Sequence, residues 1–588
     1  MSPRHPGAIA TGVAVVLALA VTQAATAAGR PDPGFGRGGL ASGPGADPSV
    51  PFGLGARAGT VALAPDGRIV VAGTRGANTA LGESVLTARF TAAGAVDPSF
   101  AGGLGRGDKL GGGAPPQRAG AVAVQADGST IVAGIAGEQW ALARFDPAGV
   151  TDGLFGAAGV TLRDPTPNDD ADDDHPADEP TLPDGTGPAA IALQADGRIV
   201  VAGSARVAND DGVPSEQVVV ARFDARGVPD PGFGNDGFTV FQLGFGSAIR
   251  HASSTARGLV LAPDGRVVVA GRASARDGGD RAFVARLTSG GRLDTSFGHE
   301  GRLLAQLGRA SAAGVASSAL YALAQRPDGR LVAAGRATDV AGDDQVLLAA
   351  FTPGGALDTS FGARGSRVTQ LARATATDAA PVSLARAVAL APDGAAVVAG
   401  AASGGALAAR YGPSGALDCS YGTRGRTLAF AGTGFDPLTD GASDAVLQPD
   451  GRLVVAGRRA GGGVLLGRLD AISATAVGAG SARLVTLAAR YTGHGRGYAY
   501  GLVDDGCSSV NVRFAVRSAS GRTVRTKVQR VFARGGPQVV CAPLQGLRPG
   551  GRYRVRVATT AHGAHGADRV LRAVKPNHRK ALAQDGCS

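Results

Sequence analysis

The chain has 588 residues, a formal net charge of +11 and a hydrophobic fraction of 44%. This length predicts several domains, and the hydrophobic fraction is ample for buried cores. Only 5% of the residues are aromatic, whereas 94 are glycine and follow no collagen period. The composition therefore favours a turn-rich β protein, with cores of Val, Leu, Ile and Ala, over a helical protein, and it excludes a collagen-like chain.

Residues 1–28 have the pattern of a secretory signal. Arg4 supplies a positive start, residues 8–21 form a small apolar core, and Ala25-Thr26-Ala27 offers a small-residue cleavage site. An uncleaved membrane anchor is the alternative. No later apolar run is long enough to span a membrane. We therefore expect an exported protein, secreted or at the cell surface, with no membrane span in the mature chain.

From residue 29 to about residue 470 one unit recurs. Its first part reads Leu-Ala-Pro-Asp-Gly-Arg-Ile-Val-Val-Ala-Gly at residues 63–73. Self-similarity at a period of about 60 residues indicates a repeat architecture. In the Pro-Asp-Gly turn, proline presets φ and glycine takes the positive φ that leads into the next strand. Each of the seven copies has one turn aspartate: Asp66, Asp127, Asp196, Asp264, Asp328, Asp393 and Asp450.

Each copy predicts four short strands. The second strand, as at residues 69–72, is an unbroken apolar run and should be buried on both faces. The fourth follows a second motif, Asp-x-x-aromatic-Gly, as at residues 294–298. Seven four-stranded units covered on both faces predict an all-β, seven-bladed β-propeller. A β-helix, whose coils are usually shorter, and an open array of small sandwiches are the alternatives.

The two alternating motifs resemble the delta-60 repeat family of bacterial proteins. The resemblance spans about residues 30–470, and residues 323–332 and 357–362 match the family's unit closely. It implies a β-propeller but no agreed activity. Several positions depart from the pattern: Ala126 and Ala195 for proline, Ala350 for arginine, Tyr421 for phenylalanine and Ala101 for glycine.

The first and last repeats are incomplete in complementary ways. The motif Asp32-Pro33-Gly34-Phe35-Gly36 has no earlier strands, and Arg468 has no motif after it. In the other copies the motif aspartate follows the third-strand Arg position by eight residues, so the two side chains should face each other across the 3–4 hairpin. We predict that Asp32 meets Arg468 and closes the ring, with a structural role for these pairs. The complete pairs are Arg89–Asp97, Arg144–Asp152, Arg222–Asp230, Arg286–Asp294 and Arg410–Asp418.

Length varies between strands 2 and 3 and between one copy's strand 4 and the next copy's strand 1. In a meandering blade both connections lie at the same end, so binding is expected on that variable loop face. Carboxylates expected there are Asp210, Asp211, Glu216, Asp343 and Asp344. The largest insertion, residues 163–187, is strongly acidic. Its Asp170, Asp172 and Asp174 have the spacing of a calcium loop, but His175 and Thr181 stand where that loop needs Gly and Glu, which favours a solvated loop.

The tail, residues 471–588, differs in charge and pattern. It has 19 Lys and Arg against 4 Asp, a net charge of +15, whereas the preceding part carries −4. Strands are expected at residues 510–516, 539–541 and 553–557. The run Leu547-Arg548-Pro549-Gly550-Gly551-Arg552-Tyr553 resembles the corner tyrosine of fibronectin type III-like sandwiches. We therefore predict a small basic β-sandwich, whose charge serves either a polyanion such as a wall polymer or only solubility.

No catalytic constellation is found in the sequence. Nucleophile elbows, phosphate loops and a convincing zinc ligand set are missing, and the propeller lacks aromatic residues interleaved with basic ones. We therefore predict no catalytic, cofactor-binding or metal residues, no cofactor and no nucleic-acid partner. Export permits disulfides among Cys419, Cys507, Cys541 and Cys587. Three full pairings are possible, and Cys507 with Cys541 is preferred.

Together these observations predict three parts: a signal peptide at 1–28, a propeller at 29–470 closed by an N-terminal strand, and a fibronectin type III-like sandwich at 471–588. The expected role is that of an exported, monomeric binding or scaffold protein. Its ligand is extracellular and unknown, a glycan or cell-wall polymer being the candidates. The alternative is an extracellular polysaccharide lyase or hydrolase with its site on the same face. A deep axial pocket with convergent carboxylates, His or Arg would favour the enzyme, and a shallow loop face would favour binding.

Overall fold

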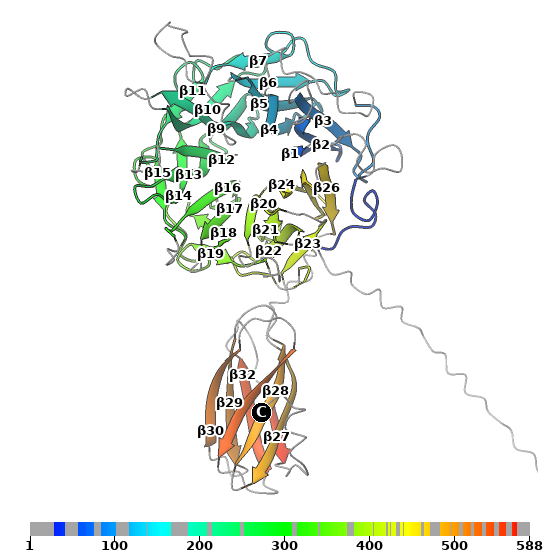
Figure 1. The fold of residues 1–588 in the computed structure, drawn as a ribbon, viewed down its shortest axis with the longest axis vertical. Coiled ribbons are helices and arrows are strands. Elements are labelled where there is room, and N and C mark those ends of the chain that lie inside the picture. Colours follow the sequence, from blue (N-terminus) through cyan, green and yellow to red (C-terminus); the bar gives the residue numbers. More distant parts are fainter. Residues whose placement is uncertain are drawn as a thin grey trace, which may run out of the picture.

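The computed structural model describes most of the repeat region and the strands of the tail (Figure 1). The described residues of the repeat region are 29–41, 57–75, 84–100, 117–137, 139–165, 186–208, 214–246, 252–308, 314–338, 342–372, 382–403, 405–418, 421–423, 425–430, 436–438, 440–459 and 464–470. In the tail they are the backbone of the strands between residues 483 and 572. The predicted signal, the core of the acidic insertion at 166–185 and the predicted domain junction at 471–480 lie outside them.

The repeat region forms seven antiparallel sheets, one for each copy of the repeat. The first four are β1 (Arg57–Leu63), β2 (Ile69–Arg75) and β3 (Ser84–Phe90); β4 (Gln117–Val124), β5 (Thr130–Ala136), β6 (Gln139–Phe145) and β7 (Val160–Arg163); β8 (Gly187–Leu193), β9 (Ile199–Ala208), β10 (Pro214–Phe223) and β11 (Phe238–Phe241); and β12 (Ser254–Leu261), β13 (Val267–Ser274), β14 (Asp280–Leu287) and β15 (Arg302–Ala305).

The last three sheets continue the same order. They are β16 (Ser318–Gln325), β17 (Leu331–Thr338), β18 (Asp344–Phe351) and β19 (Ser366–Thr369); β20 (Ser383–Leu390), β21 (Ala396–Ala402), β22 (Gly405–Tyr411) and β23 (Arg426–Ala429); and β24 (Gly441–Leu447), β25 (Leu453–Arg458) and β26 (Val464–Leu469).

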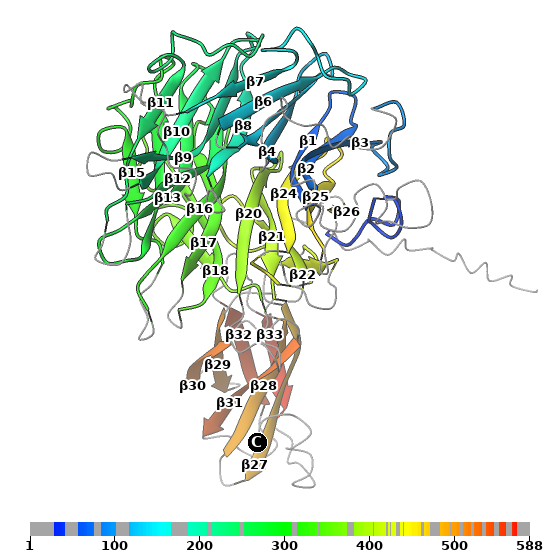
Figure 2. The same cartoon turned by 45° about the horizontal axis from the view of Figure 1, so that its top comes forward.

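These sheets are the blades of a seven-bladed β-propeller, as the repeat predicts. The first strand of each blade lies by the central axis, and the fourth lies at the rim (Figure 1). The tilted view in Figure 2 shows β16, β20 and β24 side by side around that axis. Neighbouring strands within a blade pair in chain order, so all seven blades are simple meanders. The prediction of an all-β propeller is therefore confirmed.

The turn between the first two strands has the predicted chemistry in every blade. The side chain of each turn aspartate accepts a hydrogen bond from the backbone N–H two residues on, at 2.8–3.1 Å. The glycine that follows has a φ between 79° and 88°. Asp fixes the turn and Gly supplies the left-handed residue, so the same turn forms where proline is replaced by Ala126 or Ala195.

Apolar strands from neighbouring blades share each core. The second strand is buried on both faces, and Ile69, Val70, Val71 and Ala72 are at most 1% exposed. Ile69 and Val71 pack in one cluster with Val454 and Ala456 of the last blade. The seam between the last and first blades is therefore an apolar core like the other seams.

A second contact between neighbouring blades involves an aromatic ring and a glycine. A Cβ atom on Gly94 would lie 2.8 Å from the ring of Phe35, because the ring packs directly against the glycine backbone. All seven blade junctions have this contact, so a side chain is excluded at each of these glycines. The pairs are Phe35–Gly94, Phe100–Gly149, Phe155–Gly227, Phe233–Gly291, Phe297–Gly355, Phe361–Gly415 and Tyr421–Gly29.

The predicted arginine–aspartate pairs are also present. In blade 4, Arg286 Nε donates to Asp294 at 2.8 Å, and its guanidinium lies 4.6 Å from the centre of the Phe297 ring. Its Nη1 donates to the carbonyl of Pro353 in blade 5 at 2.7 Å. The same side chain therefore organises its own hairpin and bonds to the next blade. The corresponding ion pairs are Arg89–Asp97, Arg144–Asp152, Arg222–Asp230 and Arg410–Asp418.

The ring closes as predicted, through the N-terminal segment. Arg468 Nε donates to Asp32 at 2.8 Å, and the two side chains are 7% and 6% exposed. Arg468 also stacks on Phe35 and bonds to the carbonyl of Ala92 in blade 1. Single bridges, Pro31 to Leu469 and Leu40 to Gly467, hold the segment against β26, so the described residues form bridges rather than a continuous strand.

The 3–4 turn of the last blade is built from two distant parts of the chain. In blade 1 the N–H of Thr91 donates to Ala95, and the N–H of Gly94 donates back to Thr91. In blade 7 the N–H of Asp470 donates to Arg30, and the N–H of Gly29 donates to Asp470. One turn is therefore divided between the beginning and the end of the repeat region.

The tail strands form two antiparallel sheets. The first has the order β27-β28-β31, and the second β30-β29-β32-β33. The predicted strands at 510–516, 539–541 and 553–557 lie within three of these strands. The fibronectin type III-like assignment stays a prediction, as does the disulfide pairing, because Cys419, Cys507 and Cys587 lie outside the described residues. The strands are β27 (Arg483–Gly493), β28 (Arg496–Asp504), β29 (Val510–Ser518), β30 (Thr523–Val531), β31 (Pro537–Gln545), β32 (Arg552–Thr559) and β33 (Ala567–Arg572).

Candidate functional site

The inner strand of every blade contains a β-bulge at the same position. In β12 the pairing with β13 shifts between Ala256 and Gly258, which leaves Arg257 as the extra residue. A bulge re-aims a side chain and interrupts the ladder, so it is a common device next to binding sites. The extra residues of the seven inner strands, here called the bulge ring, are Gly59, Gly120, Ala189, Arg257, Tyr321, Arg386 and Ser443.

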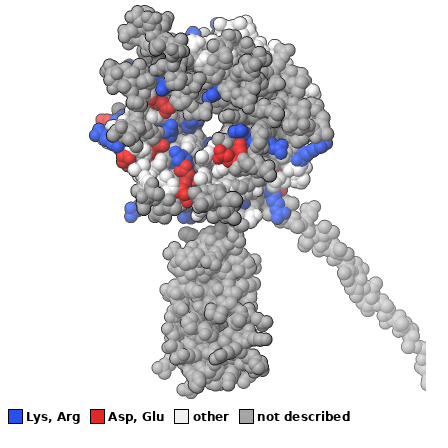
Figure 3. All heavy atoms as spheres, viewed as in Figure 1, with Lys and Arg blue, Asp and Glu red and all other residues white. Residues whose placement is uncertain are grey.

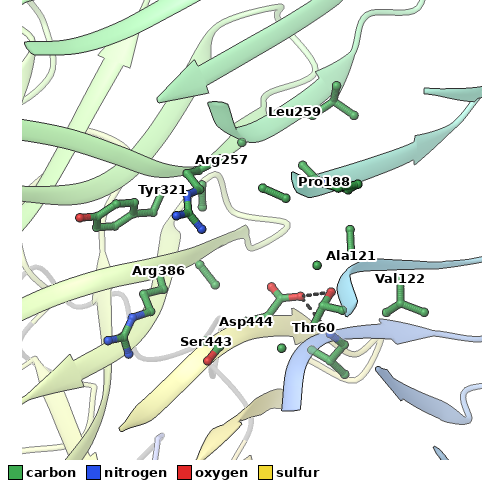
Figure 4. Close-up of a pocket in the computed structure, with 18 of the residues that line it drawn as sticks. Thr60, Ala121, Val122, Pro188, Arg257, Leu259, Tyr321, Arg386, Ser443 and Asp444 are labelled. Carbon is green, nitrogen blue, oxygen red and sulfur yellow. Dashed lines mark hydrogen bonds between the residues drawn. The ribbon is translucent and has the colours of Figure 1, made fainter. Parts of the chain in front are cut away.

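The bulge ring lines an axial cavity of about 1040 Å³. Its members differ strongly in size around the axis: Gly59, Gly120 and Ala189 are small, whereas Arg257, Tyr321 and Arg386 are long and polar. Figure 4 shows Arg257, Tyr321 and Arg386 on one side of the cavity, and Pro188, Ala121 and Thr60 on the other. One side of the cavity therefore has long polar and cationic residues, and the other is a low wall of small and apolar residues that also includes the polar side chains of Thr60 and Asp444.

Arg386 is tied to the loop at the cavity rim. Its guanidinium donates to the carbonyls of Pro437, Leu438, Asp440 and Ala442 at 2.6–3.2 Å. Burial lowers the pKa of Arg386. The charge of Arg257 lowers that pKa further, whereas Asp436 and Asp440 act in the opposite sense. Arg386 therefore places the loop before β24 and brings a positive charge to the cavity.

Tyr321 belongs to a polar chain across blade 5. Its hydroxyl accepts a hydrogen bond from Arg336 Nε at 2.8 Å, and Arg336 Nη1 reaches both oxygens of Asp344 at 2.7 Å. Burial alone lowers the pKa of Arg336, but the tyrosine and the carboxylate raise it overall. The pair therefore stays charged, and it fixes the position of the tyrosine ring against the cavity.

Asp444 lies directly after the bulge of the last blade. It accepts hydrogen bonds from the Thr60 hydroxyl at 2.9 Å and the Val61 N–H at 3.0 Å, both in blade 1, and from the Ala445 N–H at 2.8 Å. Burial raises the pKa of Asp444, and these hydrogen bonds offset only part of the shift. Asp444 therefore links the last blade to the first and places a carboxyl group of reduced acidity in the cavity wall.

The cavity lies toward the variable end of the blades. Its lining includes the first halves of the inner strands, the ends of second strands at Thr74, Arg336 and Arg458, and Leu438 of a connection between blades. These are the parts next to the 2–3 and 4–1 connections. In Figure 3 basic and acidic side chains both gather around the central opening. The expected functional face therefore contains a real cavity.

The carboxylates predicted for the functional face lie in different surroundings. Asp344 lines the cavity, as expected for the functional face. Glu216 instead lies 3.6 Å from Arg272 and accepts a hydrogen bond from Ser253, and it is not among the lining residues. Asp343 is half-buried beside Asp344 in the chain, while Asp210 and Asp211 lie outside the described residues. The expected carboxylates thus do not converge on one point.

Sequence reasoning missed the bulge ring, although a signal for it exists. Every member precedes the turn aspartate of its copy by seven residues, as Arg257 precedes Asp264 and Tyr321 precedes Asp328. The offset is constant while the residue type varies, from glycine to arginine. Positions of fixed register and varied side chain are where a repeat protein carries specificity.

Two kinds of site find no support in the described part of the chain. Within it, no group of three or more His, Cys, Asp or Glu side chains is placed to hold a metal ion. Nor do the described residues include a helix long and apolar enough to cross a membrane.

Five segments of the chain match the model of one protein family, described as "Domain of unknown function (DUF5122) beta-propeller". They are residues 64–100, 125–155, 194–233, 262–297 and 326–361, each running from a turn to an Asp-x-x-aromatic motif. No curated protein matches the chain. The match supports the propeller, while the delta-60 name stays a prediction.

Solved structures show distant likenesses. A protein from Lactobacillus plantarum is 15% identical, with 81% of this chain and 99% of that chain covered and a TM-score of 0.34. Drosophila Plexin A in complex with Semaphorin 1b is 10% identical, with 72% and 88% covered and a TM-score of 0.34. A catalytically inactive virginiamycin B lyase from Staphylococcus aureus with quinupristin is 10% identical, with 66% and 93% covered and a TM-score of 0.28. Because these TM-scores are below 0.5, the fold is assigned from the observed blades and not from these likenesses.

Proposed function

We propose that this chain is an exported binding protein whose ligand enters the axial cavity from the variable loop face. The observation that carries the proposal is the bulge ring, since its seven positions of equal register bear residues that range from glycine to tyrosine and arginine. The rim contacts, in contrast, recur from blade to blade. A rigid scaffold with one varied, concave surface is how binding sites are usually built.

The size of the cavity fits this role. The volume of about 1040 Å³ lies just above the usual range, about 300–1,000 Å³, for sites that take drug-sized ligands. The wall combines a few placed polar groups, such as Tyr321 and Arg257, with small and apolar residues. Such a lining gives orientation through polar groups and contact area through the rest.

The test is an array of glycans and wall polymers probed with the purified full chain and with Ala189→Tyr. The repeat accepts tyrosine at this register, as Tyr321 shows, so the variant should fold while its side chain fills the open side of the cavity. We expect wild-type binding to a small set of ligands and loss of that binding in the variant. Equal binding by both proteins would place the site elsewhere.

A second candidate is an extracellular enzyme acting on polysaccharides, a lyase or a hydrolase. Asp444 favours it, because a cavity carboxyl with a raised pKa can act as a general acid. The arginines that line the axial pocket also agree with an enzyme, although the expected carboxylates do not converge there. Against it, Asp344 is held by Arg336, and Asp444 has a structural role between two blades. Release of reducing or unsaturated ends by the wild type, lost in Asp444→Asn, would establish the enzyme.

Export and the tail complete the proposal. We expect processing after the signal at residues 1–28, with the basic fibronectin type III-like domain displayed outside the cell beside the propeller. Sequencing the N-terminus of the exported protein tests the first point, and an intact residue 1 would contradict it. Limited proteolysis tests the domain boundary, which should be cut at residues 471–480 before any blade is cut.

A further inference from the structure

We propose that the axial cavity selects a ligand bearing an oxyanion, a carboxylate or a phosphate, and holds that group against Arg257, Tyr321 and Arg386. This rests on the proposed binding function and adds the chemistry of the ligand. The cavity lining carries more positive than negative side chains. Five arginines, Arg118, Arg257, Arg336, Arg386 and Arg458, line the cavity with only two carboxylates, Asp344 and Asp444.

Part of this positive charge is compensated by carboxylates within the protein. Arg336 contacts Asp344 through both carboxylate oxygens and lies 3.6 Å from Asp280. Arg458 lies 3.4 Å from Asp440. These two arginines are therefore already paired, and they hold the wall in place rather than attract a ligand.

Arg386 is different. Its hydrogen bonds go to backbone carbonyls, and none of the ion pairs among the described residues includes it. Carbonyl dipoles solvate a guanidinium but do not neutralise it. A buried cation without a carboxylate contact favours any anion that can approach it.

Arg257 adds a second cation on the same side. It stands one blade from Tyr321 and two from Arg386 in the bulge ring, and Figure 4 shows the three side chains grouped on one wall. Burial is the main cause of the lowered pKa of Arg386, and the positive charge of Arg257 adds to it. A negative charge between the two arginines would relieve their repulsion. Arg and Tyr also supply the directed N–H and O–H donors that oxyanions need.

The opposite wall determines how the remainder of the ligand lies. Gly120 has a packing reason to be small, since a Cβ there would lie 1.8 Å from the carbonyl oxygen of Pro188. Because Gly59, Gly120 and Ala189 are small, the wall that they form leaves space in the cavity opposite Arg257 and Arg386. A ligand with an anionic group at one end and a neutral body of two or three sugar-sized units fits this division.

The experiment is titration calorimetry on the purified full chain with three probes. Trigalacturonate carries carboxylates, a short glycerol phosphate oligomer carries phosphates, and maltotriose is a neutral ligand of similar size. We expect at least one anionic probe to bind at millimolar concentration or tighter, with affinity that falls as salt is added, and maltotriose to bind far more weakly. The anionic probe that binds tells whether carboxylate or phosphate is preferred.

Two variants locate the contact. Arg257→Gln removes one cation of the wall and should weaken the anionic probe by about tenfold or more. Arg302→Gln, in the outer strand of the same blade, is the matched control and should bind like the wild type. Equal affinity of all three proteins would overturn the placement, provided that their melting curves are the same.

The remaining outcomes are equally decisive. Maltotriose binding as tightly as trigalacturonate would overturn the anion inference and leave the binding function intact. Failure of both anionic probes at millimolar concentration would also overturn the inference, and the ligand array with Ala189→Tyr would then decide on the binding function separately.

Discussion

The rim and the axis of this propeller are built from the same repeat but are used differently. At the rim, an Arg–Asp pair and an aromatic–glycine contact recur in nearly every blade. At the axis, the bulge ring has equally regular backbone geometry but side chains that run from Gly59 to Arg257. Uniform side chains indicate a structural requirement that every blade shares. Varied side chains at fixed register indicate a surface adapted to something without seven-fold symmetry.

The largest expected effect is at the ring closure. Arg468→Ala would leave Asp32 buried, uncover the Phe35 ring and remove the donor to the carbonyl of Ala92. Loss of one partner from a buried ion pair costs about 3–5 kcal/mol in the free energy of unfolding. Urea unfolding followed by circular dichroism measures it.

The matched control is Arg452→Ala. This arginine also reaches Asp32, at 3.2 Å, but it is 40% exposed, so its loss should cost only about 0–1 kcal/mol. Removal of residues 29–40 should destabilise at least as much as Arg468→Ala. A truncated chain that melts with the wild type would show that closure does not depend on this segment.

Blade 5 offers the next effect, because it lacks the rim arginine. Ala350 stands at that position, and Arg326 of the 1–2 turn donates instead to the carbonyl of Pro413 in blade 6 at 2.9 Å. The bond to the next blade is thus kept by a different residue. Arg326→Ala should cost about 1.5–3 kcal/mol, the usual value for a hydrogen bond from a charged group.

The control for blade 5 is Arg330→Ala. Arg330 belongs to the same turn and lies 3.6 Å from Asp358, but it is 46% exposed. Its loss should change the free energy of unfolding by less than about 1 kcal/mol. If the two variants are equally stable, Arg326 does not replace the missing rim arginine.

The rim contacts could be predicted from the sequence more completely than the residues at the axis. The rim could be predicted down to the pair Asp32–Arg468, because the motif aspartate recurs in all seven copies and the arginine in six, with a constant offset of eight residues where a copy has both. The replacement of the missing rim arginine by Arg326 could not be predicted, because it depends on a contact between a side chain of one blade and the backbone of the next. The bulge ring has an offset as constant as the rim's, but no shared residue type draws attention to it. Asp444 and Tyr321 become candidates only once the inner strands are arranged around one axis.

The aromatic–glycine contact can be separated from the strain of a left-handed backbone. Gly94 and Gly67 have φ values of 83° and 84°, but only Gly94 has a neighbour, the Phe35 ring at 2.8 Å from a Cβ; nothing lies within 4 Å at Gly67. Gly67→Ala should therefore cost about 1–2 kcal/mol for its backbone conformation alone.

Gly94→Ala has the same backbone cost and in addition forces the ring away. We expect it to be less stable than Gly67→Ala by about 1–3 kcal/mol, the range for an overpacked core. The comparison needs only the unfolding midpoints and slopes of the two variants. Identical values would mean that the ring shifts freely, and that the contact does not fix the spacing of the blades.

The smallest effect, and the one that best contrasts rim and axis, is the dependence of stability on pH. At the rim, burial raises the pKa of Asp294, but hydrogen bonds from Ser296 and the charge of Arg286 outweigh it and lower the pKa to about 2. An unfolded aspartate titrates near about 3.9. The folded protein therefore binds this proton less readily, and the stability that Asp294 contributes is present above about pH 4 and is lost as the pH falls toward about 2.

At the axis the sign is reversed. Burial raises the pKa of Asp444, so the folded state binds its proton more readily than the unfolded state does. The stability linked to Asp444 is full below the unfolded pKa of about 3.9 and is lost as the pH rises through the raised folded value.

Asp294→Asn should thus flatten the rise of stability between about pH 2 and pH 4, whereas Asp444→Asn should steepen the rise above about pH 4. Urea unfolding of both variants over this range measures the slopes, and the absolute stabilities do not enter, because Asn also changes the hydrogen bonds at each site. If both variants change the slope in the same direction, the charged form of Asp444 is stabilised as well as the charged carboxylates at the rim. Asp444 would then be a poor general acid, and the case for the second candidate function would fail.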